Sequence, residues 1–278
     1  METTLTVRRL SAPDNDAVVR LLDAEPLAGA FVADRLEVLG WSRSNRLYGY
    51  GRGGELTAVC LSGGNLVPVG CDDAAADAFA DMARREGRQC SSIVGAGPAV
   101  RRLWRGLRPH WGEARAVRER QPLLMIDRPP AVAPDPFVRR STRADVPALF
   151  PAAVAMYTEE VGVSPLADRA GASAYRDRLE FLVAVGRSYA RIDNGRVVFK
   201  AEVALQTRHT AQIQGVWVAP HLRGRGLAAP CMAAVIADAL HRHAPTVSLY
   251  VNDFNAPALR TYRRCGMREA GELATVLF

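Results

Sequence analysis

The sequence decides its fold around Arg223-Gly224-Arg225-Gly226-Leu227-Ala228. This run follows an apolar segment that ends at Val218-Ala219-Pro220, and a helical pattern comes after it. Glycines between a strand and a helix let the backbone approach a ligand closely. The start of the helix supplies unpaired N–H groups and the positive end of the helix dipole. With two arginines added, the run predicts a binding site for a phosphate-bearing cofactor.

The segments on both sides of this run predict a strand, a helix and a second strand. Residues 212–218 are rich in β-branched and aromatic residues, which is typical of a strand. A helix follows, because Met232, Val235, Ile236, Ala239 and Leu240 recur at helical spacing and Pro230 falls in the first turn. Residues 247–251 predict the second strand. It leads through Asn252-Asp253-Phe254-Asn255 to a short helix that ends before Gly266.

Length and composition describe an ordinary globular protein. The chain has 278 residues, 49% of them apolar, and a formal net charge of +7. This length favours two domains. No apolar run is long enough for a transmembrane helix, and the first residues lack the apolar core of a signal peptide, so we expect a cytoplasmic protein without a membrane partner. The basic residues form no dense run with interleaved aromatics, so nucleic acid is not an expected partner.

The cysteines predict neither a disulfide framework nor a structural zinc site. They are odd in number and widely scattered, and they form no C-x-x-C pair. We interpret them as buried, reduced side chains and expect no metal. They are Cys60, Cys71, Cys90, Cys231 and Cys265.

A proline-rich segment divides the chain into two halves with similar openings. We predict a first domain at residues 1–128, a linker at 129–136 and a second domain at 137–278. Each half opens with a pattern that predicts a short strand and a polar turn that caps a helix. In the first half this pattern is Val7–Asp14, before a helix expected at 17–23, and in the second it is Val138–Asp145, before a helix expected at 146–157.

A hairpin follows in each half. The first pairs residues 46–50 with 55–61 around the turn 51–54, and the second pairs 188–192 with 196–205 around Asp193-Asn194-Gly195. Because the same order of elements occurs twice, we predict that the chain arose by duplication.

The phosphate-binding run has no counterpart in the first half. Cys71-Asp72-Asp73 stands at the matching place, after a strand expected at 65–70. Two carboxylates suit the start of a helix but repel a pyrophosphate. The first half is therefore expected to keep the fold and to lack this cofactor site.

The order of strand, R-G-x-G-x-A turn, helix, strand and N-x-x-A-x-x-x-Y-x-x-x-G-M resembles the GNAT superfamily of acetyl-CoA-dependent N-acyltransferases. The resemblance covers Phe137–Phe278, and two separate motifs agree in order and spacing. The whole chain resembles an actinobacterial tandem group whose N-terminal half is a diverged GNAT-like domain. This implies an α/β protein (an α+β mixed sheet) of two tandem GNAT-like domains. Each would be a central, twisted, mostly antiparallel sheet flanked by helices.

The resemblance also implies a set of acetyl-CoA-binding residues. The backbone amides of the turn would wrap the pyrophosphate, and the backbone of the preceding strand would pair with the pantetheine arm. An asparagine after the later strand, Asn252 or Asn255, would face that arm. The turn residues are Arg223, Gly224, Arg225, Gly226, Leu227 and Ala228, and the strand residues are Val216, Trp217 and Val218.

Two residues are candidates for proton transfer. The resemblance assigns Tyr262 as the acid that protonates the departing thiolate, and a phenol with a pKa near 10 suits that role. The alternative for Tyr262 is an amphipathic helix residue with its hydroxyl in water. Glu202 is a candidate general base, but it shares a strand face with Lys200 and is alternatively paired with it or solvated.

Other polar residues of this half leave the base open. Gln212 and Gln214 are the alternative, through an ordered water. His209 and His221 lie in turn-like stretches and are expected at the surface.

Glu159 and Glu160 are candidates for binding the acceptor. They lie at the end of the first helical pattern of the second half, before Gly162. Carboxylates near a helix C-terminus are unfavourable for the dipole, and attraction of a cationic amine would explain them. The alternative is a solvated helix end. A last strand is expected at 274–278.

The leading hypothesis is an N-acetyltransferase that transfers an acyl group from acetyl-CoA to a primary amine by direct attack. The acceptor is a small molecule or a peptide, and the oligomeric state stays open. A non-catalytic acyl-CoA sensor or scaffold is the alternative. A Rossmann-type dinucleotide site is excluded, because no G-x-G-x-x-G follows an early strand.

Overall fold

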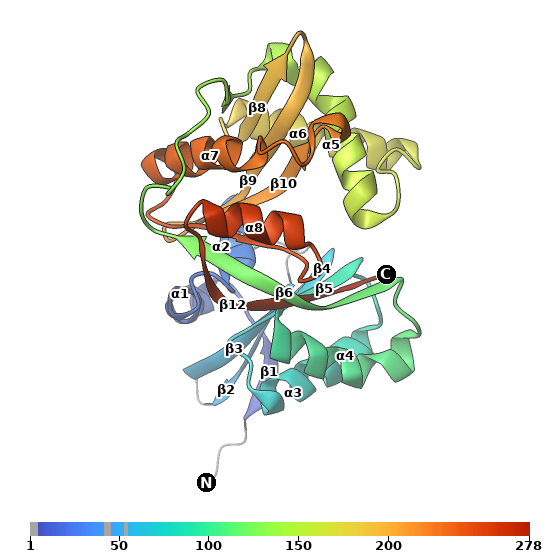
Figure 1. The fold of residues 1–278 in the computed structure, drawn as a ribbon. Helices are drawn as coiled ribbons and strands as arrows, with labels where there is room; N and C mark the ends of the chain where they lie inside the picture. The colour runs from blue at the N-terminus through green and yellow to red at the C-terminus, as the bar shows by residue number, and fades with distance from the viewer. Residues whose placement is uncertain (1–4, 42–45, 53–54) are drawn as a thin grey trace. The chain divides into compact units, whose positions relative to one another are not determined.

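The computed structural model describes residues 5–41, 46–52 and 55–278 (Figure 1). The chain forms two compact units. The first comprises the chain up to Leu123 together with Tyr250–Asn255 and Glu269–Phe278, and the second comprises Leu124–Leu249 and Ala256–Arg268. Each unit is an α/β structure with a mixed sheet, so the predicted fold class is confirmed.

The first unit contains a sheet with the strand order β1-β2-β3-β4-β5-β12-β6. The pairs β1–β2, β2–β3, β3–β4 and β5–β12 are antiparallel, and β4–β5 is parallel. Its elements are β1 (Thr6–Arg9), α1 (Asn15–Ala24), α2 (Ala30–Leu39), β2 (Arg46–Arg52), β3 (Glu55–Ser62), β4 (Asn65–Val69), α3 (Asp73–Glu86), β5 (Ser92–Ala96), α4 (Gly97–Trp111), β6 (Ala116–Ile126) and β12 (Arg268–Leu277).

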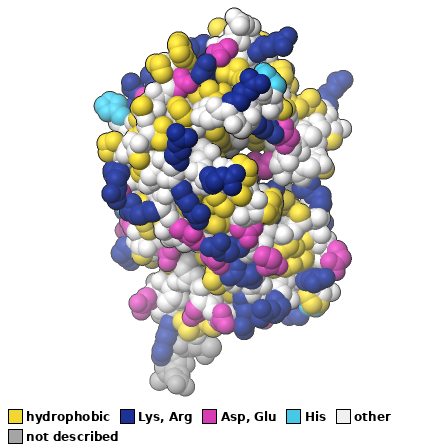
Figure 2. Space-filling model, viewed as in Figure 1, with side chains coloured by type: hydrophobic (Ala, Val, Ile, Leu, Met, Phe, Trp, Pro, Cys, Tyr) yellow, Lys and Arg dark blue, Asp and Glu magenta, His cyan; other side chains and the backbone are white. Residues whose placement is uncertain are grey.

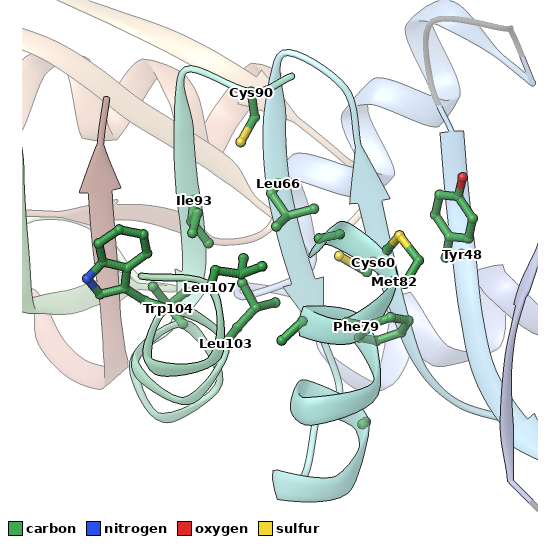
Figure 3. Close-up of a cluster of buried hydrophobic side chains, with 14 of the residues drawn as sticks. Tyr48, Cys60, Leu66, Phe79, Met82, Cys90, Ile93, Leu103, Trp104 and Leu107 are labelled. Carbon is green, nitrogen blue, oxygen red and sulfur yellow. The ribbon is translucent and has the colours of Figure 1, made fainter. Parts of the chain in front are cut away.

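Helices cover both faces of this sheet. Successive side chains along a strand point to opposite faces, so each strand contributes to both helix-covered cores. In β3, Ala58 and Cys60 join a core with α3 and α4, whereas Val59 and Leu61 join a core with α1 and α2. Figure 3 shows the first of these cores, with Phe79 of α3 among the labelled side chains.

The second unit contains the strand order β11-β10-β9-β8-β7. The pairs β7–β8, β8–β9 and β9–β10 are antiparallel, and β10–β11 is parallel. Its elements are β7 (Arg139–Arg140), α5 (Val146–Val161), α6 (Arg169–Ala184), β8 (Ser188–Asp193), β9 (Arg196–Gln206), β10 (Ala211–Val218), α7 (Ala228–Arg242), β11 (Val247–Tyr250) and α8 (Ala256–Arg264).

The second sheet is also covered on both faces. Ala190 of β8 packs in a core with α5 and α6. The next residue along the strand, Tyr189, points the other way, and its hydroxyl donates to Asp238 of α7 at 3.0 Å. The apolar stripe of α7 is buried as predicted, with Met232, Val235 and Ile236 fully inaccessible.

The openings of the two units match residue by residue. Arg8 pairs with Asp14 in the first, and Arg139 pairs with Asp145 in the second, at 2.6 and 2.7 Å. Each aspartate also accepts from the backbone N–H of the residue that opens its turn, Ser11 or Thr142. The repeated openings that indicated duplication therefore form the same local structure.

Both predicted hairpins are present. In the second, Asn194 and Gly195 have φ angles of 50° and 74°, which suits a tight two-residue turn. In the first, Gly53 and Gly54 of the predicted turn lie outside the described residues. The helices α2 and α6 and the strand β6 were not predicted.

The units differ from the predicted division in two respects. β12 was expected in the second domain, but it pairs with β5 of the first unit. The proline-rich segment 129–136 was expected to be a linker, but it lies along the second unit. The N–H of Ala131 donates to Cys265 O at 2.9 Å, and that of Asp135 donates to Pro230 O at 3.0 Å.

Candidate cofactor and acceptor site

The glycine turn holds a backbone shape that other residues resist. Gly224 and Gly226 have φ angles of 74° and 79°, in the left-handed region. No atom lies within 4 Å of the point where a Cβ would stand on either glycine. The turn is therefore open on the side that a ligand would approach.

The helix after this turn begins without a cap from its own chain. α7 starts at Ala228, Leu227 precedes it, no side chain caps it, and no acidic residue lies in its first turn. The first N–H groups of a helix have no acceptor within the helix. These groups and the helix dipole are therefore available to an anion.

In the first unit, two carboxylates occupy the N-terminus of the helix that corresponds to α7. Asp72 caps α3 and accepts from the N–H of Ala75 at 2.8 Å. Asp73 lies in the first turn and pairs with Arg102 at 2.9 Å. The prediction that these two residues stand at a helix start is confirmed.

The strand before the glycine turn parts from its parallel neighbour. β10 and β11 pair only at Ala211↔Val247 and Gln212↔Ser248. Beyond these positions, this edge of β10 has no strand partner in the second unit, and it includes Val216, Trp217 and Val218. In the first unit, the parallel strands β4 and β5 also pair at only two positions. They nevertheless stay in contact further along, because a Cβ on Gly95 would lie 2.9 Å from the Pro68 carbonyl oxygen.

A buried lysine of β9 contacts a bulge in β10. The pairing with β9 shifts between Gln214 and Trp217, and Gly215 has a φ of 61°. Lys200 of β9 is fully buried, and its Nζ donates to Gly215 O at 3.0 Å and to Glu202 Oε2 at 3.3 Å. The pairing of Glu202 with Lys200, left open by the sequence, is therefore present. A glycine within a strand pattern is the sequence feature that indicates such a bulge.

Glu159 is bound to the glycine turn and to β10. Its Oε2 pairs with Arg223 Nη2 at 2.7 Å, and its Oε1 accepts from Trp217 Nε1 at 3.4 Å. Arg223 Nε also donates to the Val218 carbonyl at 2.9 Å. This carboxylate therefore ties the end of α5 to the turn, an arrangement that the sequence did not indicate. The helix was expected at 146–157, but it extends to Val161 and ends before Gly162, which has a φ of 79°.

The ring of Tyr262 is buried, whereas the alternative of a hydroxyl in water stays open. Burial, and then the negative charge of Glu160, raise the pKa of its phenol above the ordinary value. Within the described part of the chain its hydroxyl makes no hydrogen bond. A buried ring whose hydroxyl lacks a protein partner leaves a donor available to a ligand.

Aromatic rings lie close to Glu160 and Glu202. Tyr157 and Tyr175 meet edge to face at 5.2 Å between ring centroids. Burial raises the pKa of Tyr175, and the charges of Glu202, Tyr157 and Glu160 raise it further, in that order. Two carboxylates thus act on one tyrosine, and the charge of Arg178 opposes them.

The remaining predicted residues are the asparagines after β11 and the polar side chains of β10 and its neighbouring turns. Asn252 and Asn255 belong to the first unit, where Asn252 Oδ1 accepts from Gln121 at 2.9 Å. The other polar candidates are Gln212, which accepts from Gln214 at 3.1 Å, His209, half-buried in a turn, and His221, exposed before the glycine turn.

Neither a metal centre nor a membrane span is found in the described ranges. No group of three His, Cys, Asp or Glu residues there is placed to hold a metal ion. None of the helices described combines the length and apolarity needed to cross a bilayer.

Comparison with known proteins agrees with this arrangement. The model of the acetyltransferase (GNAT) family matches residues 150–267. That of a domain of unknown function (DUF4081) matches residues 45–149. Among curated proteins, no relative of the chain is found.

Solved structures similar to the chain extend over its whole length. A GCN5-related N-acetyltransferase from Sphaerobacter thermophilus is 17% identical, with 98% of this chain and 94% of that chain covered and a TM-score of 0.62. A GNAT-family acetyltransferase from Colwellia psychrerythraea is 12% identical, with coverages of 98% and 99% and a TM-score of 0.58. A tandem GNAT protein from the clavulanic acid biosynthesis pathway is 14% identical, with both coverages 98% and a TM-score of 0.57. Residues 150–267 are therefore similar to the acetyltransferase (GNAT) family and residues 45–149 to a DUF4081 domain, in a chain with the fold of tandem GNAT proteins.

Proposed function

We propose that the chain is an acetyl-CoA-dependent N-acetyltransferase with one cofactor site, in its second unit. The observation that carries this proposal is the open glycine turn before the uncapped N-terminus of α7, at the end of a strand that parts from its neighbour. Acetyl-CoA is the cofactor typical of the family. The first unit, with carboxylates at the start of α3, serves as a diverged partner domain of the actinobacterial tandem type.

The residues present fit this cofactor. The turn Arg223–Ala228 holds the diphosphate through backbone N–H groups at the uncapped start of α7, although the N–H of Arg223 itself donates to Pro220 O at 3.2 Å. The free edge of β10 at residues 216–218 pairs with the amide groups of the pantetheine arm. When bound, the cofactor supplies an acyl group activated as a thioester.

The acceptor is a primary amine that arrives as a cation. Glu160 and Glu202 both raise the pKa of Tyr175, against the effect of Arg178, and they are the carboxylates proposed to attract this cation. Glu202 is the proposed base that takes a proton from the amine, and Lys200 holds its carboxylate in place. Glu159, the other proposed acceptor-binding residue, is paired with Arg223 and orders the turn.

Tyr262 is the proposed acid. Its raised pKa keeps the phenol protonated at neutral pH, and its hydroxyl is not engaged by another described residue. It therefore has a proton to donate to the departing thiolate. Backbone N–H groups at the β10 bulge are the proposed donors to the carbonyl oxygen that becomes negative during attack.

The experiment is an amine panel, covering amino acids, amino sugars and short peptides, with CoA thiol release as the readout. We expect at least one amine to be acetylated, and Tyr262→Phe to lower kcat about 100-fold with CoA affinity nearly unchanged. Tyr50→Phe, a buried tyrosine of the first unit, is the matched control and should keep full activity. CoA binding without acyl release from any amine would contradict the proposal and favour an acyl-CoA sensor or scaffold.

A further inference from the structure

Three arginines of α8 share one exposed face and have no acidic partner among the residues that the structure describes. Arg260, Arg263 and Arg264 are spaced three and four residues apart, so they are neighbours on the helix surface, and all are exposed. Like charges at this spacing destabilise a helix unless an anion compensates for them. The segment between Asp253 and Glu269 contains no acidic residue.

The segment contains a fourth arginine, Arg268, which does have an acidic partner. Arg268 is paired with Asp127 at 2.7 Å, whereas Arg260, Arg263 and Arg264 form no ion pair with any residue that the structure describes. Arg263 and Arg264 complement the dipole at the C-terminus of α8, but Arg260 lies a turn earlier, where that effect fades.

The end of α8 lies against the start of α7. Cys265, which follows Arg264 directly, donates from its Sγ to Ala229 O, the second residue of α7, at 3.4 Å. The arginine-bearing end of α8 is therefore beside the helix N-terminus that receives the diphosphate in the proposed function. Figure 2 shows Lys and Arg side chains over the part of the view where Figure 1 places α7 and α8.

Binding of the diphosphate does not require the positive charges of these three arginines. The N-terminus of α7 and Arg225, which is exposed in the turn and unpaired among the described residues, already supply a diphosphate site. Coenzyme A carries one more phosphate, on the 3′-oxygen of its ribose. We propose that Arg263 and Arg264, with Arg260 behind them, form the subsite for this 3′-phosphate, a subsite that depends on the proposed acetyl-CoA function.

The test compares CoA with dephospho-CoA, which lacks only the 3′-phosphate, by isothermal titration calorimetry on the full chain. We expect wild type to bind CoA about ten-fold or more tightly than dephospho-CoA, because charge-assisted hydrogen bonds to the third phosphate are lost. In Arg263→Gln/Arg264→Gln, the CoA affinity should fall while the dephospho-CoA affinity stays, so that the ratio drops to within about three-fold.

The matched control removes two positive charges elsewhere in the second unit. Arg169→Gln/Arg196→Gln changes two exposed arginines that have no side-chain partner among the described residues, and it should keep the wild-type ratio. A wild-type ratio near one, or an unchanged ratio in the α8 variant, would overturn the subsite and leave the acetyl-CoA site standing. Failure of wild type to bind either compound would overturn both.

Discussion

At the scale of single residues, Lys200 has the most unusual environment. It is the only lysine among 36 Lys and Arg residues, and it is fully buried. Burial of an ammonium group is costly unless hydrogen bonds and an opposite charge compensate, and Gly215 O and Glu202 supply both. A Cβ on Gly215 would lie 3.0 Å from Nζ, so glycine at the bulge gives the lysine its room.

Lys200→Met should lower the free energy of unfolding by about 3 kcal/mol, because Glu202 keeps its charge without a partner. Adding Glu202→Gln to this variant should recover part of the loss. Urea denaturation of both single variants and the double variant measures this coupling. Strict additivity of the two substitutions would show that the pair is not coupled.

The raised pKa of Tyr262 predicts the alkaline side of the pH profile. A raised pKa keeps an acid protonated to higher pH, so the phenol stays a donor up to and beyond about pH 10. We expect kcat to rise as the amine and its base lose protons and then to stay level to about pH 10. Stopped assays of CoA release across this range check it; a fall in kcat near neutral pH would remove Tyr262 from the role of acid.

The sequence predicted some residues of the site and missed others for a physical reason. The glycines of the turn were predictable because a strand-to-helix connection that binds phosphate imposes a local backbone shape. The contact of Glu159 with Arg223 was not, because the two residues are far apart in the chain and only the packing of α5 on β10 joins them. The position of α8 beside α7 was not predictable either, because only the packing of the two helices brings them together.

At the scale of elements, the two units open with the same capped turn. Hydrogen bonds from Arg139, and then from the backbone of Thr142, lower the pKa of Asp145 despite partial burial. Arg8 and then Ser11 do the same for the pKa of Asp14. These carboxylates lock the start of α5 and of α1, so an identical device holds the first helix in each unit.

Asp145→Asn and Asp14→Asn should each lower stability at neutral pH by about 1 kcal/mol, as loss of a cap does. Because each pKa is lowered on folding, the stabilisation is complete above the unfolded pKa near 4 and declines as the pH falls below it. Urea unfolding at a series of pH values measures this. The difference between wild type and variant should shrink in acid, and a difference that grows in acid would contradict the assignment.

At the scale of the whole molecule, the last strand determines how the chain is divided. Ala274 and Val276 of β12 are buried in the core that α3 and α4 form on the first sheet. The sequence predicted the strand but not its partner, because an apolar strand is compatible with any sheet edge. Local patterns therefore predicted many, though not all, of the elements, and long-range pairing decided which unit receives β12.

Val276→Ala should weaken the first unit, by about 2 kcal/mol for a truncated core side chain. Native-state hydrogen exchange should show the loss in α4 and β5 and little change in α7. Val235→Ala, at a fully buried valine of α7, is the matched control and should give the opposite pattern. Loss of protection in α7 upon Val276→Ala would place β12 with the second unit.

The most direct test of the account is the stoichiometry of acetyl-CoA binding to the full chain, measured by isothermal titration calorimetry. We predict one site per chain, and an affinity at least about ten-fold weaker in Gly226→Trp, whose side chain would fill the open turn. Gly87→Trp, at a glycine of similar φ with equally open surroundings after α3, should bind as wild type does. Two sites per chain, or unchanged binding in Gly226→Trp, would contradict a single site at the glycine turn.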